Sequence, residues 1–197
     1  MEGTNPVNKK LAAALSGGAV LVLALSGCSS SDDNSEKLNS WAKQVCDAVQ
    51  PQTKKITAAN TAIQKQTADD SAPEDVQKVD SQAFQDISDA YKAMATAVRK
   101  AGAPDVENGK KKQQDAVQEL NDLSTAYAGL KKKSDDLDTK DQAKFADGLK
   151  GVATELEKLS KSGSDALAKL EEGEVGQAMA KQRSCKSASA PASAGKS

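Results

Sequence analysis

The sequence predicts an all-α fold: an up-down-up-down four-helix bundle, with room for a short fifth helix, closed by one disulfide. Four segments of roughly 30 residues carry apolar side chains at alternating three- and four-residue steps, which is typical of amphipathic helices. Aromatic residues make up only 3% of the chain. Much of the apolar content is alanine, which favours closely packed helices over a sheet. Two of the three cysteines lie near the two ends of the helical region, where this topology brings the ends together.

The first segment keeps its apolar phase across Pro51. A proline inside a helix removes one backbone donor and clashes with the preceding turn. Because the phase is the same on both sides, we expect a kink at Pro51; a break is the alternative. The apolar series consists of Leu38, Ala42, Val45, Val49, Ile56, Ala59 and Ile63.

The second and third segments are delimited by residues that begin and end helices. Ser71–Glu74 fits a capping box with a proline in the first turn, and Gly102 followed by Pro104 ends the second helix. The third helix is the weakest prediction, because Gly109 and Gly129 each cost about 1 kcal/mol relative to alanine. The apolar series of the second segment consists of Val76, Ala83, Ile87, Tyr91, Met94 and Val98.

The fourth segment begins where Thr139–Gln142 can cap it and ends at Gly173. Residues 174–182 are expected to add the short fifth helix. The helical bundle domain is therefore predicted over residues 37–186, followed by a disordered Ser/Ala/Gly tail at 187–197.

The N-terminus has the order of a secretory signal. Lys9 and Lys10 precede an apolar run of about 15 residues, which is shorter than the roughly 20 that a membrane-spanning helix needs. The run ends in Leu25-Ser26-Gly27-Cys28, which closely resembles the lipobox of bacterial lipoproteins. The alternative is an ordinary secreted protein with a chance cysteine.

The lipobox resemblance implies a signal peptide over residues 1–27 and a lipid on the Cys28 thiol. Cleavage would follow Gly27, and Cys28 would become the acylated first residue. Two or more acyl chains anchor a protein stably, so we expect the chain on the extracytoplasmic face of the cell membrane. The polar residues 28–36 are expected to form a flexible tether.

Charge and composition exclude several functions. Of the 27 Lys and Arg and the 28 Asp and Glu, two and one respectively lie in residues 1–27, so the mature chain has a net charge of −2. This balance argues against a nucleic-acid partner. The chain has no histidine, which excludes Ser-His and Cys-His nucleophiles and His-ligated metals. We expect no catalytic residue, no metal and no cofactor.

Cys46 and Cys185 are predicted to form a disulfide, because they are the two cysteines left in an exported chain. The closed loop of about 140 residues would contribute roughly 5 kcal/mol as an upper figure. Two free thiols or a redox pair are the alternative.

Four polar motifs are interpreted as surface features. Lys110–Lys112 and Lys131–Lys133 lie about 30 Å apart on one helix, so they form no single basic patch. The first of them could still face anionic headgroups. Asp135–Asp141 lacks the glycine and the distal glutamate of a calcium loop, and Gly195–Ser197 lacks the earlier glycine of a phosphate loop.

The five aromatic side chains that could stack on sugars are interpreted mainly as core. Tyr91 and Tyr127 follow the apolar phase of their helices, and Phe84 lies one heptad before Tyr91. The other two are Trp41 and Phe145.

The sequence therefore predicts a membrane-anchored, non-enzymatic lipoprotein that acts as an interaction or structural module of the cell envelope, with an envelope protein or surface as its partner. The mature domain looks like the small secreted lipoproteins of actinobacteria. The alternative is a solute-binding lipoprotein that holds a small apolar ligand between its helices.

Overall fold

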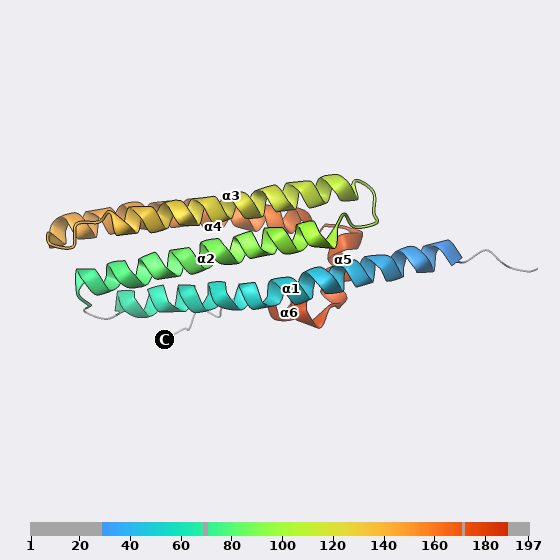
Figure 1. Ribbon diagram of the computed structural model, residues 1–197, viewed down its shortest axis with the longest axis horizontal. Coiled ribbons are helices and arrows are strands. Elements are labelled where there is room, and N and C mark those ends of the chain that lie inside the picture. The colour runs from blue at the N-terminus through green and yellow to red at the C-terminus, as the bar shows by residue number, and fades with distance from the viewer. Residues whose placement is uncertain (1–28, 69–70, 171, 189–197) are drawn as a thin grey trace, which may run out of the picture.

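The structure, a computed structural model, describes residues 29–68, 71–170 and 172–188. Every regular element in these residues is a helix, which confirms the all-α prediction (Figure 1). The six helices are α1 (Ser29–Ala68), α2 (Pro73–Ala101), α3 (Gly109–Asp135), α4 (Gln142–Leu170), α5 (Glu174–Lys181) and α6 (Arg183–Ala188).

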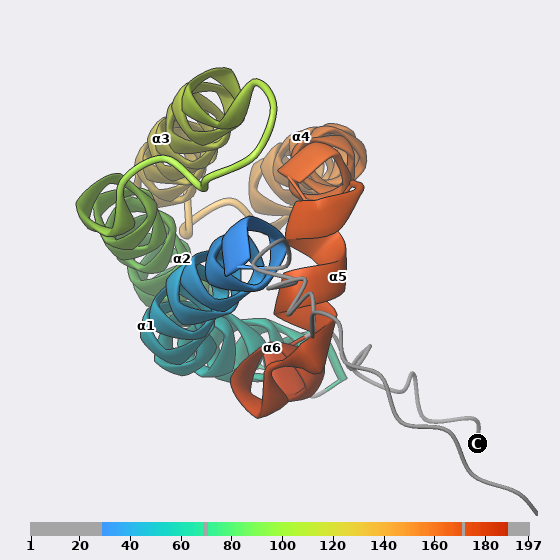
Figure 2. The same cartoon turned by 90° about the vertical axis from the view of Figure 1, so that its right-hand side faces the viewer.

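The four long helices run alternately up and down, and each packs against the next in the chain (Figure 1). We call the end where α1 begins the proximal end and the end where α3 turns into α4 the distal end. The short helices α5 and α6 pack against α1 on the side away from α2 (Figure 2). The predicted bundle is thus confirmed, with two short helices where one was expected.

The core is built in layers along the bundle. The proximal layer joins α1, α2, α3 and α5 around Trp41, Met94 and Leu120, and the distal layer joins α2, α3 and α4 around Phe84, Leu130 and Val152. Ile63 of α1 packs against the distal layer. Side chains from all four long helices therefore meet at the distal end.

Helix α1 corrects the prediction of a flexible tether over residues 28–36. The helix begins at Ser29, and the polar side chains of Asp33 and Glu36 remain exposed on it. A helix that is packed further along can extend through residues that bury nothing, and acidic residues near its N-terminus interact favourably with the helix dipole. The helix also continues through Pro51, so the alternative of a break there is wrong.

The start of α2 differs from the predicted capping box. Its N-cap is Ala72, which makes no side-chain hydrogen bond, and Pro73 occupies the first turn. Because the residue before a proline is held in an extended conformation, Ala72 takes the N-cap geometry and Ser71 lies one position too early. The predicted stop is confirmed: Gly102 has φ +78°, a conformation that favours glycine.

The distal connection between α3 and α4 is held by two side chains. The Gln77 amide of α2 donates to the carbonyl oxygens of Ser134, Asp135 and Leu137 at 2.9, 3.1 and 3.0 Å, where α3 has run out of intrahelical donors. Asp141 accepts from the backbone N–H groups of residues 143 and 144, both at 3.1 Å, and so caps α4 as predicted.

The C-terminal elements extend slightly beyond the predicted domain. Helix α5 agrees with the expected short helix at 174–182, while α6 was not predicted and includes Ser187 and Ala188. The predicted disordered tail therefore begins at least two residues too early. Its remainder, 189–197, lies outside the described residues, as do the predicted signal peptide and Cys28.

Candidate functional site

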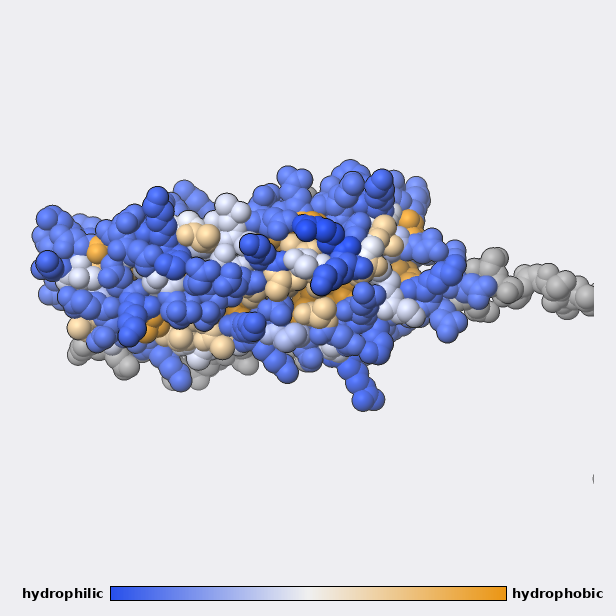
Figure 3. All heavy atoms as spheres, viewed as in Figure 1, coloured by the Kyte–Doolittle hydropathy of each residue, from blue (hydrophilic) through white to orange (hydrophobic). Residues whose placement is uncertain are grey.

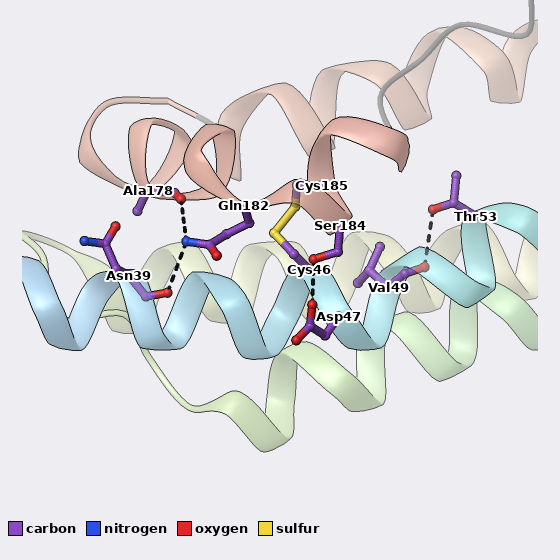
Figure 4. Close-up of a disulfide and its surroundings, with 9 residues drawn as sticks. All are labelled: Asn39, Cys46, Asp47, Val49, Thr53, Ala178, Gln182, Ser184 and Cys185. Carbon is purple, nitrogen blue, oxygen red and sulfur yellow. Dashed lines mark hydrogen bonds between the residues drawn. A yellow bond between two sulfur atoms is a disulfide. The ribbon is translucent and has the colours of Figure 1, made fainter.

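The disulfide joins the middle of α1 to α6. Cys46 and Cys185 are bonded at an S–S distance of 2.01 Å, with their Cα atoms 5.0 Å apart (Figure 4). Cys46 is fully buried in the proximal core. The sequence prediction of this pair is confirmed, and the free-thiol alternative does not describe this structure.

Hydrogen bonds beside the disulfide attach the same two segments. The Ser184 hydroxyl donates to Asp47 at 2.6 Å, and the Gln182 amide donates to the Asn39 carbonyl at 3.4 Å (Figure 4). Lys43 also binds Asp47, at 2.5 Å. The Lys43 hydrogen bond, with that of Ser184, lowers the pKa of Asp47 below its ordinary value. This cluster ties α6 to α1 and holds no reactive group.

The charged motifs form exposed ion pairs within the described residues. Lys111 pairs with Asp115 and Lys131 with Asp135, each at 2.5 Å and one helical turn apart. Lys144 reaches the capping residue Asp141 at 3.2 Å. Backbone and side-chain hydrogen bonds from Lys144 lower the pKa of Asp141. Among the residues that the structure describes, no three Cys, Asp or Glu side chains are grouped so as to hold a metal ion.

The aromatic side chains lie in the core rather than on a sugar-binding surface. Phe84, Trp41 and Phe145 are at most 7% exposed, and the Trp41 indole donates to the Gly102 carbonyl at 2.8 Å. Tyr91 and Tyr127 stack at 5.6 Å between ring centroids. Burial raises the pKa of Tyr91 to about 12.

The bundle interior also holds polar side chains. Ser88 of α2 donates to the Ser124 carbonyl of α3 at 2.8 Å, and both serines are buried. Gln52 of α1 has a buried side-chain oxygen without a hydrogen-bond partner. Sequence reasoning missed Gln52, although the apolar series of the first segment steps from Val49 to Ile56 and leaves its position vacant.

Asp80 is the most unusual titratable group in the described part of the chain. It is 5% exposed, its Oδ1 has no hydrogen-bond partner, and it lies one turn before Phe84 on α2. Desolvation by burial raises the pKa of its carboxyl to about 6. No ion pair among the residues that the structure describes includes Asp80. Asp80 was also missed, at the position where the second apolar series steps from Val76 to Ala83.

The outer side of α1 and α2 carries an open groove of about 830 Å³. Its floor consists of the buried Ala59 and Ala83, and its walls include Ala58, Ala62 and Val79, which are half-buried or exposed. The space-filling view shows apolar residues in a broken band over these two helices, between hydrophilic ones (Figure 3). Small side chains here allow another helix to approach closely.

The same surface continues toward the proximal end. Residues seven or fourteen positions apart share a helix face. On α1, Pro51 therefore lies on the side of Ala58, and Ala48 on the side of Ala62. On α2, Ala93 and Ala97 continue the side of Val79 and Ala83. We call this surface the alanine face. Its members are Ala48, Pro51, Ala58, Ala59 and Ala62 of α1 and Val79, Ala83, Ala93 and Ala97 of α2.

Charged residues border the alanine face. Lys55 of α1 and Asp86 and Asp89 of α2 line the same groove, and none of them belongs to an ion pair of the described structure. A second groove of about 620 Å³ lies between the same two helices at the proximal end, where Lys37 and Asp105 are among its lining residues. Sequence analysis did not identify this face, because alanine fits a core and an exposed contact surface equally well.

None of the described helices is both long enough and apolar enough to cross a membrane. Comparisons with models of protein families, with curated proteins and with solved structures gave no match.

Proposed function

We propose that this chain is a lipid-anchored envelope protein whose helical bundle presents the alanine face to a protein partner. The observation that carries the proposal is this face: apolar, open along two adjacent helices, and bordered by charges that form no ion pair within the described chain. Alanine side chains lose no rotamer freedom on burial, so a helix can dock there at low entropic cost.

Two further features support an anchored module. Helix α1 begins directly after the lipobox cysteine, so a lipid on Cys28 would be connected to the bundle without an intervening loop. The disulfide ties the C-terminal helices to α1, and such bonds persist in oxidising compartments outside the cytoplasm. Together they suit a rigid domain held close to a membrane.

The anchor is tested by replacing the thiol that would carry the lipid. In a bacterium that processes lipoproteins, we expect the full chain in the membrane fraction, and we expect Cys28→Ser to move most of it to the soluble fraction. The physical reason is the loss of the acyl chains, each buried CH₂ of which contributes about 0.8 kcal/mol. Fractionation and immunoblotting measure the distribution.

Ser31→Ala is the matched control, because it changes a residue close to the lipobox without touching Cys28 or the Cys46–Cys185 disulfide, and it should stay in the membrane. A Cys28→Ser chain that remains membrane-bound, or a wild-type chain that is soluble, contradicts the anchor.

A second candidate function is the binding of a small molecule between the helices. The unpartnered interior oxygens of Gln52 and Asp80 favour it, because a ligand with hydrogen-bond donors would satisfy them. For this candidate, native mass spectrometry of the full chain extracted from its own membrane is expected to show a reproducible small-molecule mass that is lost in Asp80→Leu. A bare protein mass in repeated preparations would eliminate it.

A further inference from the structure

We infer that the occupant of the alanine face is a second copy of this chain, packed in parallel so that α1 of each copy lies against α2 of the other. This inference rests on the proposed function and names the partner of the same surface. A two-fold axis parallel to the bundle produces this arrangement, since it exchanges the two helices across the contact.

Charge complementarity supports the parallel pair. Ala59 and Ala83 share one core layer, so Lys55, one turn before Ala59, lies at the level of Asp86 and Asp89, beyond Ala83. In the parallel dimer, Lys55 of each copy therefore faces Asp86 and Asp89 of the other, and the contact occurs twice. Such opposed charges fix the register of an interface and disfavour other partners.

The proximal groove adds no net charge complementarity, because Asp33 and Glu36 line it beside Lys37 and Asp105. The same two-fold axis places Lys37 of one copy opposite Asp105 of the other, but Asp33 and Glu36 offset this contact. At the distal end, Lys78 lies beside Asp75 on α2, and their charges cancel. Gln66 of the other copy therefore meets no net charge.

Orientation also favours parallel packing. An antiparallel pair would set α1 of one copy against α1 of the other, with Lys55 opposite the neutral Gln66. It would set Asp86 and Asp89 of one copy near Asp75 and Lys78 of the other. It would also place the two α1 N-termini at opposite ends of the dimer. In the parallel pair both N-termini lie at one end, so two lipid anchors on Cys28 could enter the same membrane.

The size of the surface is adequate for a specific contact. With the two grooves included, the contact surface extends from Gln44 to Gln66 of α1 and is about 33 Å long, and two helices of about 10 Å diameter make it about 20 Å wide. It therefore offers about 600 Å² per copy. A total of about 1,200 Å² is at the lower end of stable interfaces, which indicates a modest affinity.

The test exchanges the charges between copies. The full-length, lipidated protein is co-expressed with two different tags and extracted in mild detergent, and the fraction of one tag captured with the other is measured. We expect wild-type copies to co-purify. Lys55→Asp alone, and Asp86→Lys with Asp89→Lys alone, should reduce capture at least tenfold, because each sets like charges opposite each other.

The decisive experiment co-expresses the two charge variants with each other. A Lys55→Asp copy paired with an Asp86→Lys/Asp89→Lys copy has opposite charges at both contacts, so capture should return to the wild-type level. Thermal unfolding of each variant verifies that the bundle remains folded. The inference would be overturned if wild-type copies did not co-purify, or if the single-type charge variants co-purified as well as the wild type.

This outcome is distinguishable from failure of the proposed function. If copies do not pair but a photoreactive probe at Ala58 traps another protein in cells, the second-copy inference fails while the interaction module stands.

Discussion

Removal of the disulfide is expected to lower the free energy of unfolding by about 4–5 kcal/mol. Cys46 and Cys185 are 139 residues apart, so their bond removes much of the chain entropy of the unfolded state. For a domain of this size, the loss corresponds to a fall of roughly 10–20 °C in Tm. Thermal unfolding of Cys46→Ala/Cys185→Ala, followed by circular dichroism, measures it.

The matched control is chemical reduction. A reductant should lower the Tm of the wild-type protein to that of the double variant and leave the variant unchanged. Helix α6 should detach first, because it is short and its main contacts within the described residues are with α1, to which the disulfide ties it, and with α5. A double variant that unfolds within 2 °C of the oxidised wild type would contradict the role of this bond in holding the fold.

Ionisation of Asp80 is expected to destabilise the bundle as the pH rises. Its pKa is about 6 in the folded state against an ordinary value of 3.8, so between these pH values the folded state keeps a proton that the unfolded chain has lost. The free energy of unfolding should therefore fall between about pH 4 and pH 7, by about 3 kcal/mol from this group. Urea unfolding at a series of pH values measures the profile.

Asp80→Asn should remove this part of the pH dependence, because a neutral amide of the same shape cannot ionise. Asp122→Asn is the control, since Asp122 is exposed on α3 and its replacement should leave the wild-type profile intact. If the pH profiles of Asp80→Asn and the wild type coincide, Asp80 is ionised at the same pH in the folded and unfolded states. That result would contradict its burial as an unpaired group.

Much of the fold follows from local patterns in the chain. The apolar series around Leu38–Ile63 and Val76–Val98 identify the packed faces of two helices, and Gly102 and Asp141 mark boundaries where the structure has them. The pairing of Cys46 with Cys185 follows from the cysteine count, and the topology agrees with it, since alternating helices return the chain to the proximal end. These predictions depend on periodicity, caps and chain direction, all of which a sequence displays.

Other features depend on neighbours that are distant in the sequence. Ser71 has the chemistry of a cap, yet Pro73 shifts the helix start by one residue. The polar residues from Ser29 resemble a linker in composition, but they continue a helix that is stabilised by packing further along. In both cases composition alone was the wrong guide.

The candidate contact surface was harder to predict for a related reason. Ala58 and Ala62 are open to the groove, whereas Ala59 and Ala83 are buried beneath it, and the residue type is the same. Their exposure is decided by how α1 and α2 lie against each other. Asp80 and Gln52 are different: each interrupts an apolar series, and that interruption is a usable sequence signal for buried polar groups.

The most direct test of an interaction module is photocrosslinking on intact cells. A photoreactive amino acid replaces Ala58 on the alanine face, and in the control it replaces Thr125, an exposed residue of α3. We predict a covalent adduct from position 58 and none from position 125, with a mass of two chains if the partner is a second copy. The absence of adducts from both positions would contradict the claim that this protein acts through its alanine face.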